Sequence, residues 1–590
     1  MNRNKIFKSL EEATAYLFSE EIEADIISMP PDVDDLTDEE QFDDDNLSTP
    51  FLSDVAGTLE IAVRDDNDNS IISDKIKEKK SRKRKRETPL VEWTNETPTY
   101  TFGTLGNSSK RNFDLLITNA NNMSPTELFE EFFTESVYGM IVEETNRYAK
   151  EVKNKLNFNV TKDEIKTFIG FLIFSGYHTL PSERDYWAEA EDLGVAIVKN
   201  SMTRNFYLEL KKLLHFQDNK LHQHNKHDKS FKIRPLIEML SKNFQKWGIF
   251  HENLSVDEMI VRYYGHHTLK QFIKAKPIRF GYKLWALCGN DGYCYNFSLY
   301  CGKESNSSET DKLPLGTKVV LNLLSIVDDP NSHCIYFDNF FTSHALLKKL
   351  KEMQFRASGK IRENRTEKCP LMDDKKMSKK ERGFYDSKFD KTNEILAVKW
   401  KDNKNVSLAT NFDTILPLSS VSRWNVEKKE KVKVNQPHAI TSYTSFMGGV
   451  DLHDWLLEKH SVAIRGKKWY FCLITRMIDM AIVNGFVIYK KIHGSKLMSI
   501  KDFRRYIAVS YLKKGANSKA VLGRPVIRQI TSRSNVLPEV KFDKIQHIIG
   551  KREKQRRCQF DNCPSKPRTY CMKCDATLCI ECFPLFHTKP

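Results

Sequence analysis

The chain has 590 residues, of which 40% are hydrophobic and 11% aromatic, so it is long enough for several domains with substantial cores. Its formal net charge of +15 favours a polyanionic partner, most commonly nucleic acid. The first twenty residues are charged and lack an apolar stretch, and the longest apolar run is short and interrupted by Asp479. We therefore expect a soluble intracellular protein without a secretory signal or membrane span.

The N-terminal region has an unusual charge pattern. Residues 21–46 are rich in Asp and Glu and contain no Lys or Arg, a composition typical of disorder. The compact basic run from Lys79 to Arg86 follows, and it is typical of a nuclear-localisation signal. The alternative is a solvated charge run that touches DNA. We predict that residues 1–109 form a disordered region with an acidic and a basic part.

Folded structure is predicted from Ser124 onward. SPTELFEEFF carries a capping box of Ser124 with Glu127 and has proline at the first helical position. TKDEIKTFIGFLIFSGY repeats the capping box with Thr161 and Glu164. Amphipathic patterns continue through SMTRNFYLELKKLLHF, so residues 110–250 are predicted to form a helical domain.

Strands and helices alternate over residues 251–365. ENLSVDEMIVRYY predicts a strand, RFGYKLWALCGNDGYCYNFSLYCG a hairpin with Asn290, Asp291 and Gly292 in its turn, and HCIYFD a short buried strand. The segments LGTKVVLNLLSIV and TSHALLKKLKEM predict helices, and FRASGKI predicts a final strand. This order suits one mixed sheet flanked by helices, an α/β fold.

The remaining chain divides into four predicted parts. Residues 366–445 are polar with short strands such as EILAVKWKD and NVSLATNF, which indicates a β-rich insertion. Helices resume at Val450 and fill residues 446–512. A linker at 513–545 then precedes a cysteine-rich end at 546–590.

Several aspartates lie where a purely structural role is costly. Asp257 lies inside the apolar strand LSVDEMIV, and Asp338 directly follows the buried run CIYF, so each carboxylate needs a compensating positive charge. Asp451 and Asp454 begin the helix in GGVDLHDWLLEKH and share one of its faces. If these three segments converge, divalent cations such as Mg²⁺ remove the repulsion and stabilise both oxygens of a phosphoryl displacement.

Each aspartate taken alone also has a structural interpretation. Asp451 could cap the helix, Asp454 could be a solvated residue and Asp338 could belong to a turn. Glu258 rivals Asp257, but neighbouring strand residues point to opposite faces. Convergence of the three segments is what favours catalysis.

Five motifs in this order resemble those of piggyBac transposases and the piggyBac-derived domesticated proteins of animal genomes. They are SVDEMIVRYYG, KPIRFGYKLW, YFDNFFTS, FMGGVDLHD and IRGKKWY. The resemblance covers about Ser124 to Tyr511 together with the cysteine-rich end. It implies an RNase H-like catalytic core interrupted by the insertion, a helical domain that binds DNA and dimerises, and a C-terminal zinc-binding module.

The resemblance also implies site residues. The family's metal-binding DDD triad falls on Asp257, Asp338 and Asp451, which would hold Mg²⁺ or Mn²⁺. Asp454 matches a further aspartate that the family often needs, and Trp469 matches a tryptophan important in transposition. Some domesticated relatives have lost an acid, whereas this chain keeps all of them.

The implied activity is DNA strand cleavage at transposon ends and transfer of the freed 3′ hydroxyl to TTAA target sites, by a homodimer working in the nucleus. One alternative is a catalytically silent, DNA-binding domesticated protein. A third interpretation is a chromatin adaptor that acts through the zinc module.

Two basic segments flank the acidic motifs. The first holds Lys270, Lys274, Lys276, Arg279 and Lys283, and the second holds Arg465, Lys467 and Lys468. Phosphate contacts need such cations, so both segments are predicted to bind DNA. Trp469 could stack on an unpaired base near the cut. The alternative for Trp469 is a core aromatic, because WYFCLI is apolar.

Six of the twelve cysteines crowd into the end of the chain, a pattern that in a reducing compartment favours metal sites over disulfides. The candidate zinc ligands are Cys558, Cys563, Cys571, Cys574, Cys579, Cys582 and His587, with His547 as the eighth. A cross-brace would place Cys558, Cys563, Cys579 and Cys582 at one Zn²⁺ and Cys571, Cys574, His587 and His547 at the other. The flanking KREKQRR favours DNA as the partner of this module, and a histone tail or another protein is the alternative.

Overall fold

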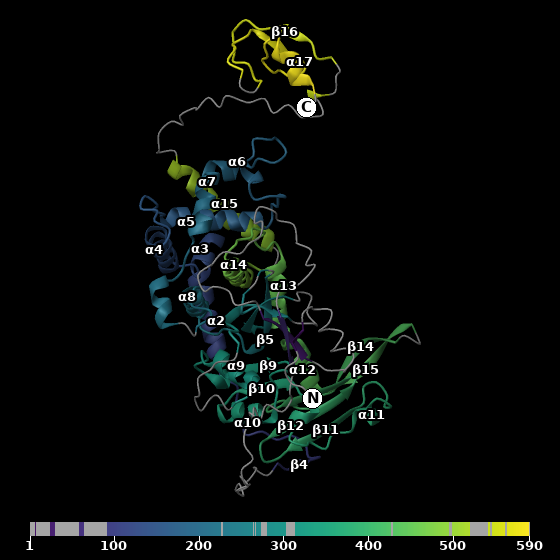
Figure 1. Cartoon of the computed structure of the whole chain (residues 1–590). Coiled ribbons are helices and arrows are strands. Elements are labelled where there is room, and N and C mark those ends of the chain that lie inside the picture. The colour runs from purple at the N-terminus through teal and green to yellow at the C-terminus, as the bar shows by residue number, and fades with distance from the viewer. Residues whose placement is uncertain are drawn as a thin grey trace, which may run out of the picture. The chain divides into compact units, whose positions relative to one another are not determined.

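The computed structural model describes residues 6–7, 24–29, 58–63, 91–225, 228–263, 265, 267–272, 280–302, 313–425, 429–494, 498–519, 541–542, 546–560 and 563–588 (Figure 1). The chain divides into two compact units, Met1–Ala520 and Val521–Pro590. The predicted nuclear-localisation run at Lys79–Arg86 lies outside the described residues.

The first unit contains a run of helices between Ser108 and Phe244. They are α2 (Ser108–Ala120), α3 (Pro125–Glu130), α4 (Glu135–Glu151), α5 (Lys162–Ser175), η1 (Asp185–Trp187), α6 (Ala196–Ser201), α7 (Arg204–Leu213), η2 (Asn219–His224) and α8 (Arg234–Phe244). Both predicted capping boxes are confirmed, at Ser124 with Glu127 and at Thr161 with Glu164. These boxes satisfy backbone donors that the first turn of a helix leaves unpaired.

A mixed sheet forms the centre of the same unit. Its strands are β4 (Trp93–Thr94), β5 (Asn253–Arg262), β6 (Gln271–Phe272), β7 (Phe280–Gly289), β8 (Cys294–Leu299), β9 (Cys334–Phe337), β10 (Arg356–Lys360), β11 (Tyr385–Asp390), β12 (Ile395–Lys401) and β13 (Asn405–Thr410). Their order is β4-β11-β12-β13-β10-β9-β5-β7-β6, with β8 beside β7. The pairs β5–β9 and β9–β10 are parallel, and the other pairs are antiparallel.

Helices connect and flank this sheet, as the sequence predicts for an α/β fold. The connecting elements are α9 (Leu315–Leu324), η4 (Pro330–Ser332), α10 (His344–Glu352), η5 (Glu363–Arg365) and α11 (Asp374–Met377). The helices after the insertion are α12 (His438–Phe446), α13 (Gly449–Glu458), α14 (Phe471–His493) and α15 (Ile500–Lys519). α12 therefore begins before Val450, and α15 extends into the segment predicted to be a linker.

The insertion is β-rich, but most of it belongs to the central sheet. β11, β12 and β13 continue the sheet beyond β10, so they cover an edge that would otherwise be open. Only β14 (Ser419–Asn425) and β15 (Glu430–Gln436) form a separate two-stranded ribbon (Figure 1). Backbone pairing therefore joins most of the β-rich insertion to the core.

The disorder predicted for residues 1–109 also needs correction in part. Residues 91–109 are folded: β4 pairs with β11, and Arg356 donates a hydrogen bond to the carbonyl of Gly103 at 2.5 Å. Three more strands, β1 (Ile6–Phe7), β2 (Ala24–Met29) and β3 (Thr58–Val63), form a small antiparallel sheet. Acidic residues between apolar ones do not prevent strand pairing.

α14 is the central helix of the hydrophobic core. By length and composition it could cross a membrane, but 94% of its apolar window is buried inside the molecule. Asp479 interrupts the apolar run and pairs with the fully buried Arg504 of α15. This pairing is how a carboxylate is accommodated in the core.

The second unit, described over residues 541–542, 546–560 and 563–588, is small. It contains β16 (Ile549–Lys551), which pairs with β17 (Thr569–Cys571), and the short helix α17 (Cys582–His587). Its buried core consists of Cys558, Cys571, Cys574, Ala576, Leu578, Cys582 and Phe586. Four of these seven side chains are predicted metal ligands.

Candidate functional site

Two of the predicted acids meet because their strands are parallel neighbours. In the register of β5 and β9, Val256 lies opposite Phe337, so the following residues, Asp257 and Asp338, lie side by side. Glu258 points away from them and forms an ion pair with Lys283 of β7 at 2.5 Å. The alternation predicted for Asp257 and Glu258 is thus the one that the strand adopts.

The third acid reaches this place through the start of α13. The backbone N–H of Val450 donates a hydrogen bond to the Ser255 hydroxyl, 3.1 Å away and two residues before Asp257 on β5. A Cβ atom on Gly449 would lie 2.4 Å from the carbonyl oxygen of Gly289, so only glycine permits this close approach. Asp451 stands in the first turn of the docked helix.

His453 provides a second attachment for α13. Its Nδ1 lies 2.7 Å from the carbonyl oxygen of Gly292, in the turn of the β7–β8 hairpin. Burial lowers the pKa of His453 to about 4, so the ring is neutral at physiological pH. Because a carbonyl oxygen only accepts, Nδ1 carries the proton and donates it.

Tyr443 of α12 marks the point where the three acids converge. Its side chain is only 4% exposed. Burial raises the pKa of the Tyr443 hydroxyl, and the negative charges of Asp338, Asp257 and Asp451 raise it further. All three carboxylates therefore lie close enough to Tyr443 for their charges to act on its hydroxyl.

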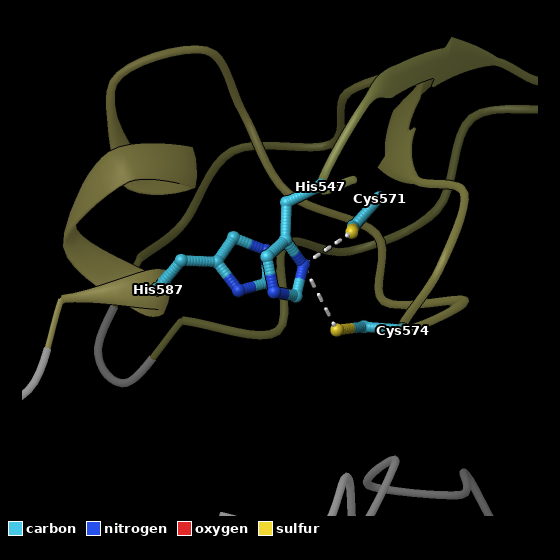
Figure 2. Close-up of side chains that lie close together, drawn as sticks. All are labelled: His547, Cys571, Cys574 and His587. Carbon is cyan, nitrogen blue, oxygen red and sulfur yellow. Dashed lines mark hydrogen bonds between the residues drawn. The ribbon is translucent and has the colours of Figure 1, made fainter. Parts of the chain in front are cut away.

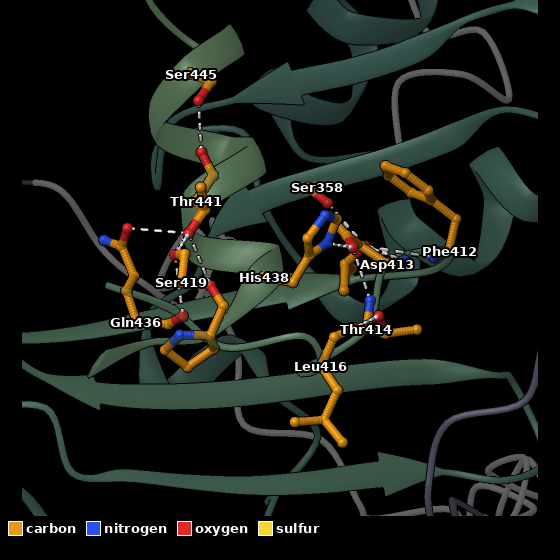
Figure 3. A network of polar contacts seen from close by, with 12 residues as sticks. Ser358, Phe412, Asp413, Thr414, Leu416, Ser419, Gln436, His438, Thr441 and Ser445 are labelled. Carbon is orange, nitrogen blue, oxygen red and sulfur yellow. Dashed lines mark hydrogen bonds and ion pairs between the residues drawn. The ribbon is translucent and has the colours of Figure 1, made fainter. Parts of the chain in front are cut away.

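A polar network fixes α12 against the sheet (Figure 3). His438, at the start of the helix, pairs with Asp413 at 2.7 Å. The backbone N–H of Asp413 donates to the Thr410 hydroxyl of β13, which also accepts a hydrogen bond from Ser358 of β10 at 2.7 Å. Thr441 links the next turn of the helix to the β14–β15 ribbon. The helix that carries Tyr443 is therefore held on several sides.

The donor set fits a hard divalent cation. Carboxylate oxygens are the ligands that Mg²⁺ and Mn²⁺ prefer, and Asp257 lies within β5 while Asp338 directly follows β9. Among the residues that the structure describes, the groups whose ligand atoms all lie within 4.8 Å of one another are two Cys/His groups of the second unit. The three carboxylates do not form a group as tight as these.

Asp454 has a different environment from the other acids. It pairs with Arg476 of α14 at 3.5 Å, and the same guanidinium bonds to Glu458 at 2.9 Å and to the carbonyl oxygen of Ile260. Arg476 and Tyr443 also lie near the acids, and the sequence did not single them out. No local pattern distinguishes either from an ordinary helix residue.

Several predicted DNA-binding cations are buried and already partnered. Lys468 is 4% exposed, donates to the carbonyl of Leu214 at 2.8 Å and lies 4.6 Å from the centre of the Tyr148 ring. Lys270 is buried and donates to the carbonyl oxygen of Gly265. In this structure the ammonium groups of these residues and of Lys283 face the protein, which disfavours the predicted phosphate contacts.

For the other basic candidates, DNA binding stays a prediction. Lys274, Lys276 and Arg279 lie outside the described residues. Arg465 and Lys467 are partly exposed.

Trp469 lies in the core. Its side chain is 7% exposed and stacks on His267, with 3.9 Å between ring centres and 11° between planes. The rings of Tyr282 and Tyr470 meet it edge-on. The core alternative describes this residue, and the predicted stacking on a base does not fit an enclosed indole.

In the second unit the structure brings the predicted zinc ligands together in two groups. One group is His547, Cys571, Cys574 and His587 (Figure 2), and the other is Cys558, Cys563, Cys579 and Cys582. This grouping is the one that the cross-brace predicts. All twelve cysteines are free thiols, so no disulfide competes with metal binding.

Both groups have the chemistry of tetrahedral zinc sites. In the first, His547 Nδ1 lies 3.4 Å from Cys571 Sγ and 3.5 Å from Cys574 Sγ (Figure 2). In the second, the Cys563 and Cys579 sulfurs are 3.9 Å apart. The Cys582 backbone N–H donates to Cys579 and lowers the pKa of that thiol, which favours the thiolate that binds metal.

Comparison with known proteins indicates the family of this chain. A family model described as Transposase IS4 matches residues 124–486. The human PiggyBac transposable element-derived protein 3 is 34% identical over 470 residues, which cover 79% of this chain and 76% of that protein. The human PiggyBac transposable element-derived protein 2 is 32% identical over 578 residues, or 96% and 93% of the two chains.

A solved structure has the same fold. It is the cryo-EM structure of a piggyBac transposase synaptic complex with hairpin DNA, which matches with a TM-score of 0.57 and 21% identity over 78% of this chain and 96% of that one. Family model, relatives and fold agree with one another. The chain belongs to the piggyBac family of transposases and transposable element-derived proteins.

Proposed function

We propose that this protein is a divalent-metal-dependent DNA transposase with an RNase H-like catalytic core. It would cut DNA at transposon ends and transfer the freed 3′ hydroxyl to TTAA sites. The convergence of Asp257, Asp338 and Asp451 around Tyr443 carries this proposal. The strand order β8-β7-β5-β9-β10, antiparallel up to β5 and parallel beyond it, supports the RNase H-like assignment.

Each part of the chain has a defined task in this proposal. Asp257 and Asp338 hold fixed positions because neighbouring strands bear them. Asp451 is placed by the contacts of Gly449 and His453 with the β7–β8 hairpin. Mg²⁺ or Mn²⁺ bound to these acids would stabilise the attacking and leaving oxygens of the phosphodiester. Fixed ligands keep the cost of reorganisation low during the reaction.

An excision assay tests the catalytic role. The substrate is a reporter gene interrupted by an element that carries the genomic repeats flanking the locus of this protein. Wild-type protein should restore the reporter, and D338N should abolish restoration, because the amide keeps the shape of the carboxylate and removes its charge. The matched control is D328N, at an exposed aspartate on the loop after α9, which should remain active.

The same assay separates the main alternative. If neither the wild type nor D338N excises the element, while both bind DNA equally, the protein is a catalytically silent DNA-binding member of the family. Excision by D338N at the wild-type rate would refute the role of the acids altogether.

For the second unit we propose two Zn²⁺ ions and binding to DNA at the transposon end. Exposed basic residues lie between His547 and the second group of ligands, among them Arg556 and Arg557. In the full chain, R556Q/R557Q should reduce the slope of log DNA affinity against log salt concentration. Each lost phosphate contact lowers that slope by about one unit. If a histone peptide binds only when the second unit is present, and DNA binding is unchanged in R556Q/R557Q, a chromatin adaptor is favoured instead.

Two further parts of the proposal concern the cell. We propose nuclear localisation, directed by the basic run at Lys79–Arg86, and a homodimer that brings two DNA ends together. Removal of that run should move a fluorescent fusion out of the nucleus. Light scattering of the full chain should give twice the mass of 68.7 kDa.

A further inference from the structure

We propose that Lys360 binds a phosphate of the DNA strand held at the three carboxylates, next to the bond that is cut. This inference rests on the proposed function and adds a residue to it. Lys360 is the last residue of β10. Its side chain is exposed, unlike Lys270, Lys283 and Lys468, the predicted cations that proved to be buried.

The register of the parallel strands puts Lys360 in line with the acids. On β9 and β10, Phe337 lies opposite Gly359, so the next residues, Asp338 and Lys360, are neighbours. Asp257 is the neighbour of Asp338 on the other side. Residues in register on adjacent parallel strands project from the same face. One cation and two carboxylates therefore form a continuous row across three strands.

The packing of α12 shows which face of the sheet carries Lys360 and the neighbouring acids. Tyr336, two residues before Asp338 and so on the same face of β9, packs against Phe446 of α12 with 5.5 Å between ring centres. Lys360 Nζ lies 5.5 Å from the centre of the Tyr443 ring on the same helix. The three carboxylates raise the pKa of that tyrosine. The ammonium and the acids thus approach the same buried side chain from neighbouring strands.

The charge of Lys360 is available to a ligand. Among the residues that the structure describes, Lys360 forms no ion pair, and its contact is the face of the Tyr443 ring. A cation–π contact does not use the three N–H donors of the ammonium in conventional hydrogen bonds, so they remain for a phosphate oxygen. A phosphodiester that approaches the carboxylates and their bound cations brings further negative charge beside Lys360. Lysine is a common partner of phosphate oxygens.

The matched variants are K360Q, K360R and K380Q. K360Q removes the positive charge, and K360R retains it. Lys380 follows α11 in the insertion, is also exposed and lies over an aromatic ring, that of Phe384, at 5.1 Å. K380Q therefore makes the same change in charge and the same change in packing away from the acids.

The experiment measures DNA affinity as a function of salt with the full, zinc-loaded chain. The probe is a fluorescein-labelled duplex with a central nicked TTAA, titrated in Ca²⁺ over a series of KCl concentrations. Loss of one phosphate contact lowers the slope of log affinity against log salt by about 0.9. K360Q should show this decrease, whereas K360R and K380Q should keep the wild-type slope.

A second probe series locates the contact. Each duplex carries one uncharged methylphosphonate at or beside the nick. At one position, the neutral linkage should lower wild-type affinity and leave K360Q unaffected. A lysine that merely offsets the charge of the acids would not single out any one phosphate.

The outcomes are distinct. If wild-type protein binds the probe and K360Q keeps the wild-type slope, the phosphate contact of Lys360 is refuted while the proposed function stands. Equal losses in K360Q and K380Q also refute it, because the effect is then one of net charge. If wild-type protein and all variants fail to bind the probe, the proposed function fails, and this inference fails with it.

Discussion

The C-terminal unit should depend on two zinc ions, each held by its own set of four ligands. Only Ala576, Leu578 and Phe586 in its buried core are not ligands. Their burial contributes about 5 kcal/mol in total, at about 1.5–3 kcal/mol for each large side chain. A structural zinc site contributes about 10–16 kcal/mol. Zinc binding is therefore expected to be the dominant source of stability in this unit.

Pairs of substitutions test how the eight predicted ligands are divided between the two zinc ions. C558S/C579S removes two ligands from one group and should retain one Zn²⁺ per chain. C558S/C571S removes one ligand from each group and should retain none. The matched control is C472S, at a partly buried cysteine of α14 in the first unit, which should retain two.

The measurements are zinc content by elemental analysis and hydrogen exchange over residues 546–588 before and after chelation. Chelation should abolish protection in this segment and leave β5, β9 and α14 protected. Equal zinc content in the two double variants would refute the partition. Protection that survives complete removal of zinc would refute the reasoning about the core.

Three further predictions concern the first unit. G449A should cost about 1–3 kcal/mol and excision activity, because its Cβ would meet the Gly289 carbonyl, whereas G448A, whose Cβ meets nothing within 4 Å, should be neutral in thermal unfolding and in the excision assay. R504M should cost about 3–5 kcal/mol in urea unfolding by leaving Asp479 buried without its partner, and adding D479N should recover much of it; no recovery would contradict the ion-pair account. K468Q should leave the salt dependence of DNA binding unchanged, since that lysine faces the core, and a reduced slope would show that it reaches DNA.

The acids and the zinc ligands could be predicted because their signals are local. An aspartate inside or directly after an apolar strand is costly unless it has a function, and Asp257 and Asp338 both stand out in this way. The CxxC pairs at Cys571 and Cys579 are equally local. Parallel pairing of β5 with β9 then brings Asp257 and Asp338 side by side.

Sheet membership could not be predicted, because it depends on partners far away in the chain. The sequence indicates strands at β12 and β13 but not that they join the central sheet, and it did not single out β11, which joins the same sheet. Its neighbour β4 lies almost 300 residues earlier, where Thr94 donates to the carbonyl oxygen of Phe389. The same limit explains the disorder wrongly predicted for residues 91–109.

The sequence also does not show which basic residues are buried and which are exposed. Lys468 and Lys467 are adjacent in a basic motif, yet Lys468 is buried against Leu214 and Lys467 is partly exposed. A lysine with a long apolar stem can bury its charge when a distant carbonyl or ring receives it. Lys360, by contrast, stands outside both predicted basic segments, and only the strand register connects it with the acids.

The most direct test of the central claim is the binding of Mn²⁺ to the zinc-loaded full chain, followed by electron paramagnetic resonance. Wild-type protein should bind Mn²⁺, and D257N, D338N and D451N should each lose that binding while D328N retains it. Binding that survives all three substitutions would contradict a metal site built from these carboxylates.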